Sequence, residues 1–344
     1  MNARRCTFYL IYFLSVYVFI EVALRMALGF LGYPILMPKE YFLDKYYGVL
    51  RPVLTREIRN DDEIKDILVL GGSVICTGYS KLDSLLPTIL VNELGDKRKY
   101  VLHNVAVPAH TSMDNLLKYR ALEGKRFDLV IYYEAINENR ANNVPEVDFR
   151  EDYSHIRWYE DIELLIAHSE INFTVVPFFL EKVIMETRNL LLHKVYINQN
   201  GVDSVYTQFG SDIKTAKSFK KNLEDIISIA GSRNEKLLML SYASYFPRRT
   251  DLTGGAEDFK YFGNCQYRTV TSLWGKSENI EKGIRIHNGI LRKLARTKGI
   301  AFLDMENIMP QDSSLFCDVC HLSEPGTKRF AKEIAQFIVK EKLL

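Results

Sequence analysis

Residues Ile67–Val74 read ILVLGGSV, and this stretch decides the fold. Four apolar residues follow one another and end in two glycines, a pattern typical of a strand buried on both faces of a parallel sheet. Ser73 then stands on a sharp turn directly after the strand. In an open α/β sheet, ligands bind beyond the carboxyl ends of the strands, so this serine is a candidate site residue.

Strands and helices alternate along the chain on both sides of this stretch. Apolar runs predict further strands at residues 101–107, 129–133, 237–241 and 301–303. Helices are predicted at residues 84–94, with Pro87 in the first turn, and at 112–122, 221–231, 287–297 and 326–342. This alternation implies an α/β fold with a parallel, doubly wound sheet.

Two regions break the alternation. Residues 141–220 form an insertion, and residues 245–282 are irregular and rich in Gly, Arg and Tyr. Within the insertion, Phe173–Ile184 is apolar but is interrupted by Glu181 and Lys182. These charges disfavour a second membrane span, and an amphipathic lid or a cleft wall is the preferred interpretation.

The N-terminus is apolar and follows a basic start. Residues 1–5 include two arginines, and Cys6–Ile20 carries no charge. A membrane-spanning helix needs about 20 mostly apolar residues, and the apolar character continues past Glu21 and Arg25, which are spaced to pair on one helix face. We expect residues 1–33 to form a membrane anchor, residues 34–65 a connector, and residues 66–344 the folded domain.

The arginine pair predicts that the N-terminus is cytoplasmic and that the folded domain is extracytoplasmic, either periplasmic or extracellular. A cleaved signal peptide, with Ala27-Leu28-Gly29 as its cleavage site, is an alternative that exports the domain equally well. A buried core helix is the third interpretation, and the terminal position and the basic flank disfavour it.

The composition is that of a globular protein. The chain has 344 residues, of which 47% are hydrophobic, and this suits one large α/β domain with additions. A net charge of +2 gives no strong attraction to nucleic acid, so we expect no such partner. The sequence does not define an oligomeric state.

Residues 316–326 read FCDVCHLSEPG and hold a second candidate site. Asp318 precedes His321 by three residues, so one turn of backbone can fold the carboxylate onto one imidazole nitrogen. The other nitrogen is then left facing a cleft. With Ser73 as nucleophile, these residues would make a Ser-His-Asp triad.

The same stretch permits two other interpretations. Cys317–His321 matches C-x-x-C-H, the pattern for covalent haem attachment, but that interpretation predicts a small helical domain and not an α/β chain. A local disulfide or metal pair at Cys317 and Cys320 is the other. No second C-x-x-C is present to complete a zinc site, and five cysteines do not make a disulfide scaffold. We expect neither a metal nor an organic cofactor.

The candidate residues fit acyl transfer. Ser73 would attack an ester carbonyl, His321 would take its proton and then protonate the leaving alkoxide, and Asp318 would hold His321. The oxyanion needs donors fixed in advance. We expect the backbone N–H groups of Ser73 and Ala109 and the side-chain amide of Asn137 to supply them. Each segment alone has an ordinary explanation as a turn or a cap, and their convergence at strand ends carries the prediction.

These segments resemble the SGNH hydrolases, also called GDSL esterases and lipases, over residues 66–140 and 220–344. The four matching blocks are residues 69–73, 104–112, 128–138 and 318–321. The resemblance implies a flavodoxin-like three-layer α/β/α sandwich with a central parallel sheet. Some members of the family share the N-terminal anchor and occur in envelope polysaccharide pathways.

Four residues depart from the pattern of this family. Gly72 replaces the Asp of the Gly-Asp-Ser motif, Ala109 and Ala135 replace glycines, and Glu138 replaces an Asp. Ala109 keeps a backbone donor, but its methyl group narrows the expected oxyanion hole, and Ala135 tightens the floor of the cleft. These changes point toward a weakened or inactive enzyme, although every group that does chemistry is retained.

The sequence therefore favours a membrane-anchored serine esterase. The resemblance and the expected exported location imply an acylated small molecule or an envelope carbohydrate as the substrate, from which the enzyme would remove O-acyl groups such as acetyl through an acyl-enzyme. An O-acyltransferase that uses the same triad is one alternative, and product analysis with a carbohydrate acceptor would distinguish it. A non-catalytic carbohydrate-binding protein of the same fold is another, and it would not react with a fluorophosphonate probe.

Overall fold

The computed structural model describes residues 3–36, 38–58, 63–95, 98–197, 201, 204–248 and 250–344. The chain divides into two compact units. The smaller unit comprises Met1–Gly48 and Ser154–Tyr196, and the larger comprises Val49–Tyr153 and Ile197–Leu344.

The larger unit is built on a five-stranded parallel sheet with the order β2-β1-β3-β4-β5. The strands are β1 (Ile64–Gly71), β2 (Lys99–Asn104), β3 (Leu129–Tyr133), β4 (Lys236–Leu240) and β5 (Ala301–Leu303). In β1, Val69 pairs with Asn104 of β2 on one side and with Ile131 of β3 on the other. The residues from Ile67 to Leu70 are fully buried, because helices cover both faces of this central strand.

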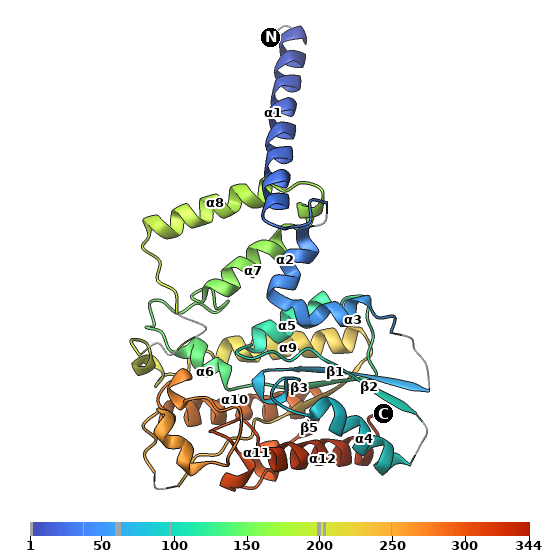
Figure 1. Ribbon diagram of the computed structural model, residues 1–344, viewed down its shortest axis with the longest axis vertical. Coiled ribbons are helices and arrows are strands. Elements are labelled where there is room, and N and C mark those ends of the chain that lie inside the picture. The colour runs from blue at the N-terminus through green and yellow to red at the C-terminus, as the bar shows by residue number, and fades with distance from the viewer. Residues whose placement is uncertain are drawn as a thin grey trace. The chain divides into compact units, whose positions relative to one another are not determined.

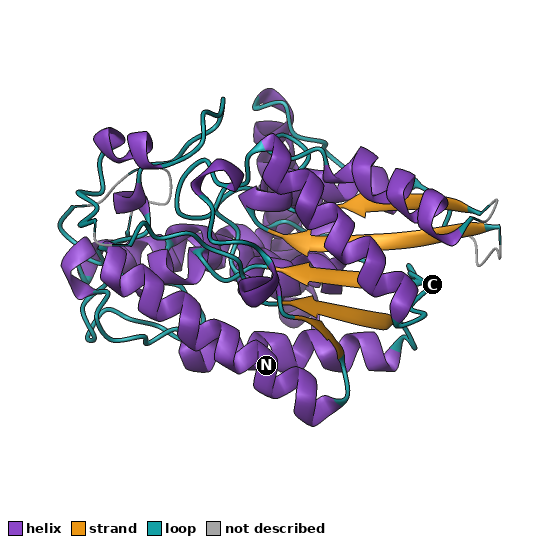
Figure 2. Cartoon of the chain, turned by 90° about the horizontal axis from the view of Figure 1, so that it is seen from below, coloured by secondary structure: helices purple, strands orange, loops and turns teal. Residues whose placement is uncertain are grey.

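Helices form a layer on each face of the sheet (Figures 1 and 2). One layer contains α5 (Ser112–Ala121), α9 (Ala216–Ser232) and α10 (Ser277–Lys298), and the other contains α4 (Leu82–Leu94) and α12 (Glu324–Lys340). The strand order is that of flavodoxin-like doubly wound sheets. The predicted fold class, a three-layer α/β/α sandwich with a central parallel sheet, is therefore confirmed.

Four predicted helices begin earlier than their sequence patterns indicated, namely α4, α9, α10 and α12. α4 begins at Leu82, whose side chain is buried with those of Leu86 and Leu90, so Pro87 lies in the second turn and not in the first. α10 begins at Ser277, inside the segment predicted to be irregular, because its buried stripe already starts at Ile280.

The segment predicted as a connector is largely helical. It contains α2 (Pro38–Tyr47) and α3 (Arg51–Thr55), which belong to different units. Residues 37 and 59–62, also assigned to the connector, lie outside the described residues.

The smaller unit contains α1 (Ala3–Phe30), α2, α7 (Arg157–Ala167) and α8 (Val176–Leu191). Its core joins the end of α1 to α7, to α8 and to the 3-10 turn η3 (Ser169–Asn172), through Leu28, Leu164, Leu165, Ile171, Val175, Phe178 and Met185. Arg25 donates to Glu21 on the same face of α1, as their spacing predicted. Among the described residues, α1 is the one helix long and apolar enough to cross a membrane.

Candidate active site

Ser73 lies directly beyond the carboxyl end of the central strand. β1 ends at Gly71, Gly72 is extended, and Ser73 begins a single 3-10 turn, η2 (Ser73–Ile75). Gly71 is required there, because a Cβ atom would lie 2.7 Å from the carbonyl oxygen of Tyr133. The Ser73 side chain is therefore held at a fixed point at the edge of the sheet.

The structure brings together the three residues predicted to form a triad. Ser73 Oγ lies 2.8 Å from His321 Nε2, and His321 Nδ1 lies 2.7 Å from Asp318 Oδ2. Asp318 Oδ1 also accepts from the backbone N–H groups of Cys320 and His321, at 3.0 and 2.8 Å. Burial alone would raise the pKa of Asp318, but the charge and hydrogen bonds of His321 outweigh it and hold that pKa below its usual value.

A tight loop presents Asp318 and His321. The N–H of Cys317 donates to the carbonyl of His321 at 2.7 Å, and Phe316 and Leu322 form an antiparallel bridge on either side. Ser323 then caps α12 by accepting from the N–H of Gly326 at 3.2 Å. The loop therefore returns the chain directly into a helix that packs on the sheet.

Ala109 follows β2 with a φ of 64°, in the left-handed region. An alanine there costs roughly 1–2 kcal/mol relative to the right-handed region, whereas a glycine would not be penalised. The backbone therefore keeps the conformation expected of the glycine that Ala109 replaces. Within the described parts of the chain, nothing accepts a hydrogen bond from the N–H of Ala109. The N–H of Ala109 as an oxyanion donor therefore stays a prediction.

Asn137 begins α6 (Asn137–Asn142) directly after β3, and its side-chain amide is fixed in orientation. Its Nδ2 donates to the carbonyl of His110 at 3.0 Å, and its Oδ1 accepts from Trp274 Nε1 at 3.1 Å. An amide carries two N–H groups, so one remains for an oxyanion. Sequence reasoning missed Trp274, because it comes from the irregular segment far along the chain.

Glu134 explains why residue 72 is a glycine. A Cβ atom on Gly72 would overlap the carboxylate of Glu134 and would lie 2.9 Å from Asn137 Nδ2. The carboxylate itself accepts from the backbone N–H of Asn137 at 2.9 Å. Burial raises the pKa of Glu134 to about 8, so this group is largely a neutral acid at pH 7. Glu134 thus fills the space beside Ser73 that the Asp of a Gly-Asp-Ser motif would need.

The Glu138 side chain joins the start of α5 to Tyr153. One of its oxygens accepts from the N–H of Ser112 at 2.7 Å, and the other accepts from the hydroxyl of Tyr153. Burial raises the pKa of Glu138 to about 7. Ala135, the remaining departure, is fully buried.

The cysteines correct one interpretation of the sequence. Cys317 forms a disulfide with Cys265, 52 residues away, so the local pair with Cys320 is wrong. The disulfide also uses one of the two thiols that C-x-x-C-H haem attachment requires. Sequence reasoning gave Cys265 no role, since spacing does not identify a distant partner.

Asp318, Cys320 and His321 place one potential metal-ligand atom each within 4.8 Å of one another. Burial raises the pKa of the Cys320 thiol well above its usual value, which disfavours the thiolate that metals bind. Both ring nitrogens of His321 are already engaged, by Asp318 and Ser73. The geometry therefore suits a proton relay better than a metal centre.

A pocket of about 440 Å³ opens beside His321. Tyr79 stacks on the His321 ring with centroids 5.3 Å apart, and Tyr267 lies 5.0 Å from Tyr79. The two tyrosines are 37% and 45% exposed, so an aromatic surface borders the pocket. The Cys265–Cys317 disulfide forms part of its wall.

No protein-family model and no curated protein matches this chain. Solved structures resemble it at low identity. A GDSL-like lipase from Bacteroides thetaiotaomicron VPI-5482 is 13% identical with a TM-score of 0.41, covering 87% of this chain and 98% of that one. An acetyl xylan esterase from Geobacillus stearothermophilus is 11% identical with a TM-score of 0.44, covering 80% and 94%. We therefore infer the function from the site itself.

Proposed function

We propose that this protein is a serine esterase that removes O-acyl groups through an acyl-enzyme formed on Ser73. The observation that carries the proposal is the continuous relay from Ser73 Oγ through His321 to the buried Asp318, with contacts of 2.8 and 2.7 Å. A serine hydroxyl is a weak nucleophile unless an adjacent base takes its proton and a third group orients that base. His321 is placed to act as that base, and Asp318 as the group that orients it.

The proposed reaction has two steps. In the first, Ser73 Oγ attacks the ester carbonyl, its proton passes to His321 Nε2, and the same proton then leaves with the alcohol. Asp318 stabilises the imidazolium. The N–H groups of Ser73, Ala109 and the Asn137 side chain would receive the oxyanion. In the second step, His321 activates a water that releases the acid and restores Ser73.

An acetylated carbohydrate is the substrate class that we propose. Tyr79 and Tyr267 offer partly exposed rings beside His321, and aromatic faces of this kind pack well against the apolar faces of sugar rings. The pocket is also rimmed by Lys81, Glu324 and Lys328, which can hydrogen-bond to hydroxyl groups.

We further propose that α1 anchors the catalytic unit outside the cytoplasm. Its uncharged run follows two arginines, as positive-inside orientation requires, and its aromatic and aliphatic side chains are exposed. The Cys265–Cys317 disulfide supports an oxidising compartment. A reporter that is active only in such a compartment, fused after Leu344, should be active. Activity of a cytoplasm-only reporter at the same position would reverse this topology.

Labelling by a fluorophosphonate probe tests the activity itself. The wild type should form a covalent adduct on the peptide that contains Ser73, and Ser73→Ala should form none. Ser232→Ala, on the exposed side of α9, is the matched control and should label like the wild type.

If the fluorophosphonate probe does not label the wild type, the esterase proposal is refuted and a non-catalytic binding protein is the remaining interpretation. If labelling succeeds, the products separate hydrolysis from transfer. Free acetate released without any carbohydrate acceptor supports the esterase. Turnover that requires an acceptor would show an acyltransferase.

A further inference from the structure

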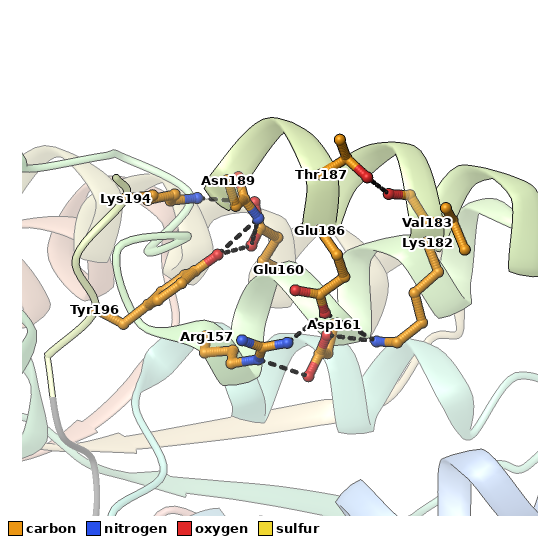
Figure 3. Close-up of polar contacts among 10 residues, drawn as sticks. All are labelled: Arg157, Glu160, Asp161, Lys182, Val183, Glu186, Thr187, Asn189, Lys194 and Tyr196. Atoms are coloured by element: carbon orange, nitrogen blue, oxygen red, sulfur yellow. Dashed lines mark hydrogen bonds and ion pairs between the residues drawn. The ribbon is translucent and has the colours of Figure 1, made fainter. Parts of the chain in front are cut away.

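Helix α8 in the smaller unit has one polar side, and that side faces the protein. Lys182 Nζ lies 3.1 Å from Asp161 Oδ1, and Asn189 Nδ2 donates to Glu160 Oε2 at 2.9 Å (Figure 3). Glu186 pairs with Arg157 beside them. In Figure 3 the three α8 side chains point toward α7, which carries their partners. α8 is therefore held to α7 by charges and hydrogen bonds, together with buried Phe178 and Met185.

The opposite side of α8 is apolar and exposed. At roughly 100° per residue, positions 180, 183, 184, 187 and 191 point away from Lys182 and Asn189. Four of these are apolar and 57–73% exposed: Leu180, Val183, Ile184 and Leu191. Leu190, Leu192 and Val195 extend this surface and are 62–74% exposed. A surface helix of a soluble protein normally turns such a stripe inward, so this outward face needs an apolar partner.

The start of α8 is fastened to α1. The Glu21 carboxylate accepts from the backbone N–H groups of Val175 and Val176, at 2.9 and 3.3 Å, and from the hydroxyl of Thr174 at 2.8 Å. A carboxylate at a helix N-terminus is favourable, because it meets unpaired N–H groups and the positive end of the helix dipole. Arg25 Nη2 also donates to the carbonyl of Asn172 at 3.1 Å.

This attachment sets the depth of α8 relative to α1. Glu21 comes directly after the uncharged run Cys6–Ile20, which spans about 22 Å as a helix. A hydrocarbon core of about 30 Å that begins near Arg5 would end close to Glu21 and Arg25. The first turn of α8 therefore lies at the level where α1 would leave the membrane.

From these contacts we propose that α8 is an in-plane membrane helix, with its apolar side inserted at the acyl–headgroup boundary of the bilayer that α1 spans. The proposal rests on the anchoring role proposed for α1. Figure 1 shows α8 extending sideways from the C-terminal end of α1, with α7 on one side of α8 and the N-terminal part of α1 on the other. The apolar side of α8 thus continues the exposed apolar surface of α1. Interfacial helices of this kind bury their apolar face about 5–10 Å into that boundary.

The lipid surface is favoured over a second copy of the chain because of this continuity with α1. The flanks of the apolar side also suit lipid headgroups. Arg188 is 64% exposed at its edge. Cationic side chains at such an edge bind anionic headgroups.

Depth-dependent fluorescence quenching tests the proposal on the full chain. Cys6→Ser removes the one exposed free thiol of the described residues, since Cys76 and Cys320 are buried. In that background Ile184→Cys carries an environment-sensitive fluorophore, and the protein is reconstituted into phosphatidylethanolamine–phosphatidylglycerol vesicles with brominated acyl chains. Glu163→Cys is the control, because this exposed position lies roughly 200° around α7 from Asp161. Quenching at position 184 should exceed quenching at position 163 several-fold.

A third label separates this proposal from the anchoring of α1. Phe13→Cys, at a 66% exposed position in the middle of the uncharged run, should be quenched if α1 spans the bilayer. Quenching at position 13 without quenching at position 184 would overturn the role of α8 alone. No quenching at either position would overturn both. A third outcome is a label at position 184 whose emission is blue-shifted but not quenched. If that blue shift disappears when the protein is diluted in the vesicles, the partner is a second copy of the chain and the lipid contact is refuted.

Discussion

Replacing Gly72 by alanine should damage both stability and activity, because of one neighbouring carboxyl group. The new methyl group would overlap the Glu134 carboxylate, which must withdraw by roughly 1 Å or more to reach an ordinary contact distance. That movement breaks the 2.9 Å hydrogen bond to the backbone N–H of Asn137. Overpacking of this kind costs about 1–3 kcal/mol, and a buried N–H left without an acceptor costs about 1–3 kcal/mol. We expect Gly72→Ala to lower the free energy of unfolding by about 2–6 kcal/mol.

The same displacement should slow catalysis. The backbone N–H of Asn137, at the start of α6, donates to the Glu134 carboxyl group, so the side-chain amide of Asn137 moves with that group. A misplacement of about 1 Å in a catalytic group can cost about a hundredfold in rate. Gly72→Ala should therefore lower kcat for a short aryl ester by about that factor, measured beside urea unfolding of the same samples.

A double-mutant cycle with Glu134→Ala tests the steric cause. With the carboxyl group removed, Gly72→Ala should cost at most about 1 kcal/mol, because only the 2.9 Å approach to Asn137 Nδ2 remains. Gly289→Ala is the control, because a Cβ atom there meets open space on α10. It should raise stability by about 0.5–1 kcal/mol. Equal losses from Gly72→Ala in both backgrounds would refute the overlap as the reason for the glycine.

Asn137→Ala should lower kcat and kcat/KM by similar factors of about a hundred or more with little change in KM, and Asn137→Asp should be at least as harmful; an increase in KM alone would contradict the oxyanion role. Glu134→Gln should flatten the pH dependence of stability. Because the folded-state pKa of about 8 exceeds the ordinary value of 4.5, the wild type loses stability as pH rises between these values, and its Tm should fall more than that of the variant from pH 5 to pH 8. Equal slopes would exclude a raised pKa at this carboxyl. Cys265→Ser should destabilise the protein by up to about 4 kcal/mol, given the 52-residue separation, and a reducing agent should then have no further effect on its Tm.

The elements of the fold and the order of the site segments could be predicted from the sequence. Buried parallel strands are short apolar runs and surface helices have a period of 3.6 residues, so each pattern is visible within a few residues of its own position. Ser73, Ala109 and Asn137 follow three such strands, and parallel strands end at one edge of a sheet. Local patterning therefore also indicated which residues would gather at that edge.

The tertiary structure alone decided the contacts between segments that are distant in the chain. Three contacts depend on packing, which produces no periodic pattern in the sequence. They are the close approach of Glu134 to Gly72, the disulfide between Cys265 and Cys317, and the hydrogen bond from Trp274 to Asn137. Helix α8 illustrates the same limit. Its amphipathic pattern is local, but its polar side faces inward because α7 presents complementary charges there. Which side of a helix is buried depends on the partner that packs against it, and only the folded chain supplies that partner.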